Sequence, residues 1–539
     1  MPAVPDRVDV AVIGGGPAGS CAANLLARRG LQVAVLERER FPRAHVGESL
    51  LPASLPILEE LGVLDAVRAE GFVEKWGATM VWGREPEPWS WYFRETNPAN
   101  PHAYQVWRPR FDQILLQGAA ARGADVHEGA AVREVRFEGE RATGVRFRDP
   151  AGRERTLGAR FVVDASGQSA LLSRRLRLRR WDAFFRNWAV YAYARGGERL
   201  PQPDSGNIFI ESYADGWIWQ IPLRGGWTSV GAVVDRERAR EGLRQGGAEA
   251  FFRRQLEAAP HAARMLADAR FEASPALVRD WSYRSRRTAG PGFVLAGDAA
   301  CFVDPLFSSG VHLALSSGVL AAAYVAGALS DESLAGPAGE VYQKLYYTQY
   351  DHFHALAKLF YSGNRTAESY FWEARRLLAE EESFSPRHAF VRALAGQPPA
   401  GYERSVLGRG ELPDGFATGV RELEDDRGRR RRRLEGADLS AAVPVLADGA
   451  GVERRPVLGD GEFVWGHAIR AASRAEETAC SPLVALLVSG IDGSRTLDEI
   501  RAGLARGRSP DEREAIARHV ERAARVLYLD GVIESLGNA

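Results

Sequence analysis

Cysteine is scarce in this chain of 539 residues, which has only Cys21, Cys301 and Cys480. These residues lie far apart and form no Cys-x-x-Cys pair, which argues against a disulfide framework and against a structural zinc site. Free thiols fit a reducing compartment, so we expect a cytoplasmic protein. The start, MPAVPDRVDVAVIGGG, has neither a basic segment followed by a long apolar stretch nor a small-residue cleavage site, and it predicts no export signal.

Two further absences narrow the range of partners. No run reaches the roughly 18 uninterrupted apolar residues that a membrane-spanning helix needs. Seventy Lys and Arg residues balance seventy Asp and Glu residues, so the formal net charge is zero. Since no overall field attracts nucleic acid or an anionic membrane, we expect neither as a partner.

The chain does contain enough apolar sequence for more than one core. It is 45% hydrophobic and 26% charged, as in globular proteins. Single cores stop growing near roughly 250–300 residues, so we expect a large domain and at least one smaller one. Residues 406–436 are Gly-rich and charged, end in RGRRRRRLEG and predict a linker. An acidic carrier protein could bind the arginines at 429–433, but a solvated linker is the simpler interpretation.

The first forty residues predict a βαβ unit that binds a dinucleotide. A β-rich run leads into Gly14, Gly16 and Gly19, which allow a tight turn and close approach of the backbone to a pyrophosphate at a helix N-terminus. Glu37 closes the second strand, where an acid can accept both ribose hydroxyls and disfavours a 2′-phosphate. A glycine turn without a ligand is the less favoured alternative. The predicted cofactor-binding residues of this unit are Gly14, Gly16, Pro17, Ala18, Gly19, Glu37 and Arg38.

A later stretch indicates that the dinucleotide is FAD. GFVLAGDAACFVDPLFSSGVHLA at 292–314 resembles the second FAD signature of the glutathione-reductase-like flavoproteins. The resemblance implies that Asp298, after Gly297, bonds the ribityl chain. It also implies that the next helix points its N-terminus, a positive dipole end, at the isoalloxazine. VWRPRFDQILL, which contains Arg108, and VVDASG are similar to further stretches of the aromatic hydroxylases of that superfamily.

The stretch GWIWQIP at 216–222 changes the expected reaction. On a strand, positions two apart share a face, so its tryptophans form one aromatic wall while the residues between and after them face the other way. The chain is similar over roughly 8–400 to the flavin-dependent halogenases, whose hallmark WxWxIP is matched by Trp217, Trp219, Ile221 and Pro222. The resemblance implies that the wall separates substrate from flavin. Ordinary packing of aromatic side chains is the alternative that spacing alone leaves open.

Other stretches carry the resemblance to the halogenases that act on phenols and pyrroles. They are PRAHVGESLLP at 42–52, EKWGATMVWG at 74–83 and DPLFSSGV at 304–311, the last resembling the family's halide-side loop. Backbone N–H groups at a helix start can hold an anion without a charged side chain. The resemblance adds Arg43, Gly47, Glu48 and Ser49 to the cofactor site, and Pro305, Ser309 and Gly310 to a halide site.

The resemblance also implies a reaction. In the family, reduced FAD from a separate NAD(P)H-dependent flavin reductase reacts with O2 to give a C4a-hydroperoxide, and chloride or bromide attacks it to give hypohalous acid. This oxidant crosses a tunnel to a lysine, matched here by Lys75, beside the aromatic substrate. A lysine in a closed apolar tunnel loses its proton more readily than in water. It can form an N-haloamine or, while charged, polarise hypohalous acid. A surface lysine on an edge strand is the alternative.

One departure bears on the substrate. Tryptophan halogenases carry a glutamate, within EPLESTG, where this chain has Phe307, so we expect the substrate pocket to take an electron-rich phenol or pyrrole of natural-product biosynthesis rather than free tryptophan. That substrate could be free or tethered to a carrier protein or peptide. A flavin hydroxylase or dehydrogenase, and an FAD-binding sensor or scaffold, are the rival interpretations. The histidines offer no metal-ligand spacing, and we expect no metal.

The predicted fold is α/β: a Rossmann-like FAD-binding domain interleaved with an antiparallel β-sheet substrate domain, a helical region and a small α+β domain. FAD-binding segments are expected at about 6–50, 105–170 and 285–330, substrate-domain segments at about 70–104 and 180–284, and a helical part at 331–405, together forming a core over 1–405. The aromatic stripe at 342–361 predicts a helix packed on a sheet, with a substrate-lining helix as the alternative.

Residues 437–539 predict a separate small domain of helix, turn, helix, long helix and final strand. Thr496 followed by Glu499 predicts a capping box at the start of a helix. The domain resembles the small winged-helix-like peptide-binding proteins of the PqqD type, which implies recognition of a peptide or carrier substrate. A structural lid and a dimer contact are the alternatives.

Overall fold

The computed structural model describes residues 4–82, 86–95, 97–279, 281–364, 425–426, 428–471 and 478–538. The chain forms two compact units. The first comprises Met1–Ala326 with residues from Tyr342 onward, and the second comprises Gly327–Val341 with the C-terminal residues. The predicted helical part beyond 364 and the predicted linker up to 424 lie outside the described residues.

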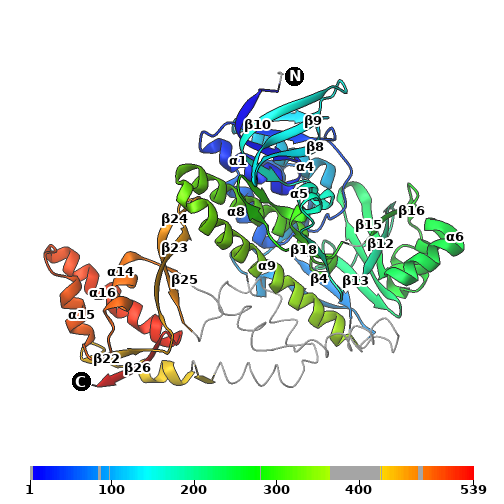
Figure 1. The fold of residues 1–539 in the computed structure, drawn as a ribbon. Helices are drawn as coiled ribbons and strands as arrows, with labels where there is room; N and C mark the ends of the chain where they lie inside the picture. The colour runs from blue at the N-terminus through cyan, green and yellow to red at the C-terminus, as the bar shows by residue number, and fades with distance from the viewer. Residues whose placement is uncertain are drawn as a thin grey trace. The chain divides into compact units, whose positions relative to one another are not determined.

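The first unit contains a sheet whose main path is mostly parallel, and its strand β10 is labelled in Figure 1. Its order is β19-β20-β10-β1-β2-β7, and all neighbours except β19 and β20 are parallel. The Val- and Ala-rich strands suit a sheet that is covered on both faces. The strands are β1 (Arg7–Ile13), β2 (Val33–Glu37), β7 (Asp125–Glu128), β10 (Glu154–Asp164), β19 (Ala289–Gly290) and β20 (Phe293–Leu295). The predicted Rossmann-like arrangement is confirmed.

Two helices pack closely beside this sheet. The first, α1 (Pro17–Arg28), follows the glycine turn after β1, and α8 (Gly310–Ser330) passes next to it. A Cβ on Gly318 of α8 would lie 2.7 Å from the Ala18 carbonyl oxygen, so only glycine allows this approach. By length and composition α8 could span a membrane, but 78% of its apolar window is buried inside the protein, as in a core helix.

A second sheet carries the two tryptophans. Its order is β16-β12-β15-β14-β13-β4-β5, and its pairs are antiparallel except β13 with β4. The predicted antiparallel sheet is confirmed, with this one parallel pairing added. The strands are β4 (Gly77–Val81), β5 (Trp89–Tyr92), β12 (Asn187–Arg195), β13 (Ile208–Tyr213), β14 (Gly216–Pro222), β15 (Trp227–Asp235) and β16 (Arg270–Phe271).

The side chains of β14 alternate between two buried environments. Ile218 belongs to a hydrophobic core that includes Phe251 and Phe252 of α6 (Arg236–Glu257). On the opposite face, the ring centroids of Trp217 and Trp219 lie 6.0 Å apart. All seven residues of β14 are buried because both faces of the strand are covered. The predicted one-sided aromatic wall is therefore present.

The second unit is an α+β arrangement around its own core. Three helices and a final strand occur in the predicted order, and that strand, β26, pairs with β22. The predicted capping box is confirmed, since the Glu499 carboxylate accepts the Thr496 N–H at 2.8 Å and the Thr496 hydroxyl accepts the Glu499 N–H at 3.2 Å. The elements are β22 (Ala442–Leu446), β23 (Gly451–Leu458), β24 (Phe463–Arg470), β25 (Thr478–Cys480), α14 (Pro482–Gly490), α15 (Leu497–Leu504), α16 (Pro510–Leu529) and β26 (Ile533–Asn538).

The arginine run differs from the predicted solvated linker. Residues 428–434 are helical, and Leu434 is buried in the core of the second unit. Arg430 donates to the carbonyl of Tyr528, and Arg525 of α16 donates to the carbonyl of Leu434. Leu434 thus anchors the segment. Arg430 satisfies a backbone carbonyl at the end of α16, and Arg525 satisfies one at the end of the 428–434 helix.

Gly231 gives a test of how the aromatic wall is built. It lies opposite Trp219 on β15, and a Cβ there would lie 2.1 Å from the indole ring. We expect Gly231→Ala to displace the ring and to lower the free energy of unfolding by about 1–3 kcal/mol. Denaturant unfolding followed by near-ultraviolet circular dichroism measures the loss. Gly158→Ala on β10 is the matched control, because its Cβ would have its nearest neighbour at 3.5 Å; an equal loss in both variants would contradict the prediction.

Candidate functional site

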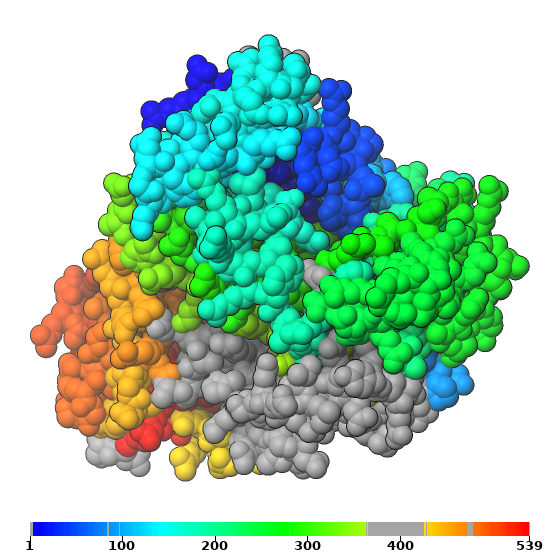
Figure 2. Space-filling view, turned by 45° about the vertical axis from the view of Figure 1, so that its right-hand side comes forward, coloured from blue at the N-terminus to red at the C-terminus, as the bar shows by residue number. Residues whose placement is uncertain are grey.

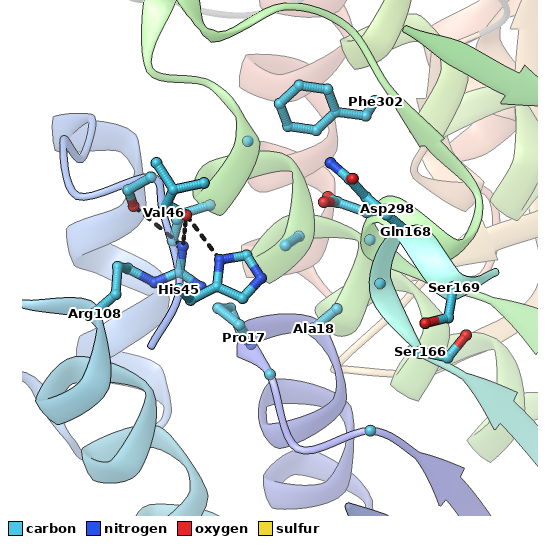
Figure 3. Close-up of a pocket in the computed structure, with 18 of the residues that line it drawn as sticks. Pro17, Ala18, His45, Val46, Arg108, Ser166, Gln168, Ser169, Asp298 and Phe302 are labelled. Atoms are coloured by element: carbon cyan, nitrogen blue, oxygen red, sulfur yellow. Dashed lines mark hydrogen bonds between the residues drawn. The ribbon is translucent and has the colours of Figure 1, made fainter. Parts of the chain in front are cut away.

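A cavity of about 590 Å³ lies in the first unit and is lined by residues of both sheets. The lining comes from the ends of β1 and β2, the start of α1, residues 43–49, strand β14 and the loop before α8. Figure 2 shows the surface hollowed between its cyan and blue segments, and Figure 3 shows part of the lining. These are the segments that the sequence assigns to a dinucleotide and to the tryptophan wall.

The glycine turn forms one end of the cavity. Gly14 has a φ of 97°, and a Cβ there would lie 2.5 Å from the Ala165 carbonyl oxygen. A Cβ on Gly19 would lie 1.9 Å from the Gly14 carbonyl oxygen. Gly16 caps α1 and Pro17 opens it, so the helix starts at the cavity with its first N–H groups lacking partners inside the helix. A phosphate can approach this backbone closely.

Glu37 lies at the same end and is held by backbone amides. Its carboxylate accepts the Gly15 N–H at 2.7 Å and the Glu39 N–H at 2.8 Å. Each carboxylate oxygen can accept a second hydrogen bond, so ribose hydroxyls could bind here. Arg38 also lines the cavity and donates to the Ser169 hydroxyl at 3.1 Å.

Arg108, the first residue of α4 (Arg108–Ala121), lines another part of the cavity wall (Figure 3). It makes hydrogen bonds of 2.8 and 2.9 Å to the two oxygens of Asp112 and donates to the Val46 carbonyl at 2.8 Å. The Nδ1 of His45 lies 2.7 Å from the same carbonyl oxygen. The positive charge of Arg108 lowers the pKa of His45 to about 4, so this imidazole is neutral near neutral pH.

The segment 43–49 brings further polar groups to the cavity. Arg43 lies 3.4 Å from Asp112. Glu48 is buried, which raises its pKa, and it accepts the Tyr193 hydroxyl at 2.6 Å and the Gly47 N–H at 3.0 Å. The hydroxyl of Ser49 is buried without a hydrogen-bond partner among the described residues. A ligand that bonds this hydroxyl would remove the free-energy cost of leaving it unpaired.

Asp298 lies beyond the carboxyl end of β20, where it lines the cavity (Figure 3). The preceding Gly297 has a φ of 60°, and a Cβ there would lie 2.9 Å from the Ala18 side chain, so glycine lets this loop meet α1. Burial raises the pKa of Asp298 to about 6, and the charge of Arg108 opposes the rise. The carboxyl group is therefore a hydrogen-bonding partner for a polar ligand chain.

These residues fit a flavin dinucleotide. The turn at Gly14 has no side chain to exclude a pyrophosphate, and Glu37 offers oxygens to a ribose. Ser49 has an unused hydroxyl, and Asp298 presents a carboxyl group to the same cavity. No side chain has to move out of the turn for a phosphate to enter.

Strand β14 supplies the aromatic wall of the cavity. Trp217, Trp219 and Ile221 line it, whereas Pro222 does not. The Trp219 indole packs over Gly231, and its Nε1 donates to the Ser229 hydroxyl at 3.3 Å. A bound ligand on the cavity side therefore meets a rigid apolar surface.

Lys75 lies outside the cavity lining, at the end of β3 (Val73–Lys75), and is 1% exposed. Its Nζ donates to the Leu50 carbonyl at 3.1 Å and to the Ser308 hydroxyl at 3.4 Å, and it lies 5.3 Å from the centre of the Phe93 ring. Burial lowers the pKa of Lys75 to about 7. Because Ser308 lines the cavity, its hydroxyl links the cavity to the amine.

The 304–309 loop connects β21 (Cys301–Phe302) to α8 and contains the predicted halide site. Pro305 and Gly310 line the cavity. Ser309 is buried outside the lining, and Phe307 instead packs edge-on against Phe360, with ring centroids 4.9 Å apart. The predicted site residues that the structure does not place in the cavity wall are Gly19, Lys75, Pro222, Phe307 and Ser309.

Some lining residues were not predicted from the sequence. They are His45, Arg133, Gln168, Ser169, Tyr191, Trp281 and Ser308. One unused signal concerns Lys75: of the seventy basic residues of the chain, only Lys75, Lys344 and Lys358 are lysines. Arginine does not release its proton in proteins, so each of these three lysines is a position at which a titrating amine could be sought.

Two protein-family models match the chain. A model of the FAD-dependent oxidoreductases matches residues 9–174, which places the cavity in an FAD-binding enzyme class. A model of the tryptophan halogenase family matches residues 94–400. A tryptophan 2-halogenase of Chondromyces crocatus is 38% identical over 70% of this chain and 72% of its own length. The chain belongs to the flavin-dependent halogenases.

Solved structures agree with this assignment. The myxobacterial chondrochloren halogenase CndH is 41% identical, over 78% of this chain and 96% of its own, with a TM-score of 0.66. The flavin-dependent halogenase CmlS is 29% identical, over 99% of this chain and 96% of its own, with a TM-score of 0.74. The predictions of an FAD-dependent halogenating enzyme that uses a halide and O2, a small aromatic substrate and a separate flavin reductase are confirmed.

Ser49 allows a test of the cofactor site. Because its hydroxyl is unpaired, we expect Ser49→Ala to stabilise the FAD-free chain by about 1 kcal/mol and to weaken FAD binding by roughly fivefold. Thermal unfolding without FAD and a fluorescence titration with FAD measure the two effects. Ser54→Ala is the matched control, since the Ser54 hydroxyl is also buried and unpaired among the described residues but lies outside the cavity. Unchanged FAD affinity in Ser49→Ala would remove Ser49 from the site.

The lowered pKa of Lys75 predicts a pH-dependent stability. Between about pH 7 and the usual lysine pKa of 10.5 the unfolded chain binds a proton that the folded chain does not, so stability rises with pH. Lys75→Met has no titrating amine at this position, so its free energy of unfolding does not gain from this effect. Measured relative to the native chain, the free energy of unfolding of Lys75→Met should fall by about 2–3 kcal/mol between about pH 7 and about pH 9. Denaturant unfolding at several pH values measures the difference. Lys344→Met, at an exposed lysine, should show no such trend; the same trend in both would refute the assignment.

Proposed function

We propose that the enzyme installs chlorine or bromine on an electron-rich phenol or pyrrole ring and that Lys75 delivers the halogen. One contact gives the main support: the Nζ of the buried Lys75 lies 3.4 Å from the hydroxyl of Ser308, which is a residue of the cavity wall. The amine is shielded from water yet one side chain away from the cofactor cavity. An oxidant formed on the cavity side could reach it without crossing bulk solvent.

The cavity residues hold the cofactor and the halide. Gly14, Gly16 and Glu37 would hold the dinucleotide. The backbone N–H groups of Ser309, just before α8, and of Gly310, its first residue, would hold a halide beside Pro305 of the cavity wall. When bound, reduced FAD activates O2 and so supplies the oxidising equivalent for the halide. Trp217 and Trp219 keep the substrate ring away from the flavin, which suppresses hydroxylation.

The lowered pKa favours the neutral amine as the reacting form. Near neutral pH about half of Lys75 is unprotonated. Its nitrogen then attacks the halogen of hypohalous acid, forms an N–halogen bond and releases water. The ring attacks that halogen, loses a proton and leaves the amine free. Ser308 orients the hypohalous acid beside the nitrogen.

The surroundings of Phe307 support the substrate class. An aromatic residue packed on Phe360 stands where the tryptophan halogenases have a carboxylate, so position 307 itself supplies no base to activate a poor nucleophile. The names of the relatives do not agree on the substrate. One relative, from Aspergillus terreus and 35% identical over 59% of this chain, is named a sulochrin halogenase, whereas the relative from Chondromyces crocatus is named a tryptophan 2-halogenase. The apolar contact at Phe307 supports a ring that is already electron-rich.

The remaining assignments extend the same proposal. A reducing cytoplasm suits the three free thiols.

We propose that residues 1–405 form the halogenating core and that the domain at 437–539 recognises a carrier- or peptide-tethered form of the substrate. The resemblance of that domain to winged-helix-like peptide-binding proteins supports this role.

Reconstitution with reduced FAD, O2, bromide and a phenol tests the proposal. Lys75→Ala should bind FAD normally but form at least about a hundredfold less brominated phenol. Lys75→Arg should fail as well, because a guanidinium supplies no neutral amine, whereas Lys344→Arg should match the native enzyme. Product formation should rise as the pH is raised through about 7, where the amine becomes neutral. A hydroxylated phenol would support the hydroxylase alternative, and full activity of Lys75→Arg would refute the amine mechanism.

A further inference from the structure

One hydroxyl group joins the tryptophan wall to the loop that carries Ser308. Tyr361 lies on α9 (Ala335–Gly363), and its side chain is fully buried. Trp217 Nε1 donates to its hydroxyl oxygen at 2.5 Å, and Asn187 Nδ2 donates to the same oxygen at 3.4 Å. The hydroxyl lies 3.1 and 3.2 Å from the two carboxylate oxygens of Asp304.

The chemistry of the groups fixes the direction of each hydrogen bond. An indole N–H and an amide NH₂ can only donate, and an ionised carboxylate can only accept. The single hydrogen of the Tyr361 hydroxyl therefore goes to Asp304, and its two lone pairs accept from Trp217 and Asn187. The hydroxyl uses its full bonding capacity, so each partner is fixed relative to the others.

Asp304 extends the connection into the 304–309 loop. Its carboxylate also accepts the Leu306 N–H at 3.1 Å and so caps the short turn that ends before Ser308. The ring of Tyr361 is itself confined by Trp82, Phe184 and Phe185, whose centroids lie 5.2–6.2 Å away. The hydroxyl cannot shift without moving this aromatic cluster.

We propose that Tyr361 is a positioning residue for halogen transfer. Its hydroxyl holds Trp217 at a fixed place relative to the loop that carries Ser308. Trp217 and Ser308 both line the cavity, and Ser308 contacts the Lys75 amine. The inference rests on the proposed role of Lys75 and adds a residue that this role alone does not require. With the hydroxyl removed, the oxidant still forms but escapes before it reaches the amine.

Tyr361→Phe removes the hydroxyl and keeps the aromatic contacts. We expect FAD affinity and O2 consumption to be unchanged, while brominated phenol per O2 consumed falls by about fivefold, corresponding to one lost hydrogen bond. Free hypohalous acid, trapped by monochlorodimedone added in place of the phenol, should rise. Tyr342→Phe is the matched control, because Tyr342 is on the same helix, fully buried, and donates to the Leu295 carbonyl at 2.6 Å.

A second pair of measurements separates positioning from general stability. Trp217→Phe removes the indole donor, so adding it to Tyr361→Phe should lower the yield no further than the worse single variant. In the FAD-free chain the indole N–H resonance of Trp217, identified by its loss in Trp217→Phe, should shift in Tyr361→Phe and not in Tyr342→Phe.

Native yield in Tyr361→Phe, an unshifted indole resonance, additive losses in the double variant or an equal loss in Tyr342→Phe would each overturn the inference. Failure of the proposed function gives a different result, since Lys75→Ala would then keep its native yield whatever Tyr361→Phe does.

Discussion

Burial of the Lys75 amine is the constraint on which the site depends. Its nitrogen contacts a carbonyl, a hydroxyl and an aromatic ring, and no ion pair to it is present among the described side chains. Keeping an ammonium there costs several kcal/mol, and loss of the proton relieves that cost. A carboxylate near the amine would favour the ammonium and oppose the effect of burial, which lowers the pKa of Lys75 to about 7.

The tryptophan wall and the packing of α8 depend on where the backbone can approach closely. Gly231 makes room for the Trp219 indole on the neighbouring strand, and Gly318 lets α8 pass next to α1. The wall and the start of α8 thus depend on residues that carry no chemistry themselves. Tyr361 then ties the wall to the 304–309 loop through polar contacts. Small residues set the distances, and hydrogen bonds set the orientations.

Local pattern predicted the parts of the fold that are local. The turn at Gly14, the alternation along β14 and the cap at Thr496 each lie within a few residues of sequence, and the structure contains all of them. The contact of Lys75 with Ser308 joins residues 233 positions apart, and that of Trp217 with Tyr361 joins residues 144 apart. Such pairings depend on the packing of two sheets and a helix, which no short spacing encodes. The arginine helix at 428–434 was missed for the same reason, since its leucine is buried by distant elements.

Methionine is as scarce as cysteine in this chain. The chain has three cysteines and three methionines, the side chains whose sulfur atoms are oxidised most readily, and only three lysines. Cys21, Cys301, Met80, Met265 and Lys358 are buried. Burial also raises the pKa of the Cys21 and Cys301 thiols, which keeps them in the less reactive protonated form. Burial thus shields four of the six sulfur-containing side chains from any oxidant in the surrounding solvent.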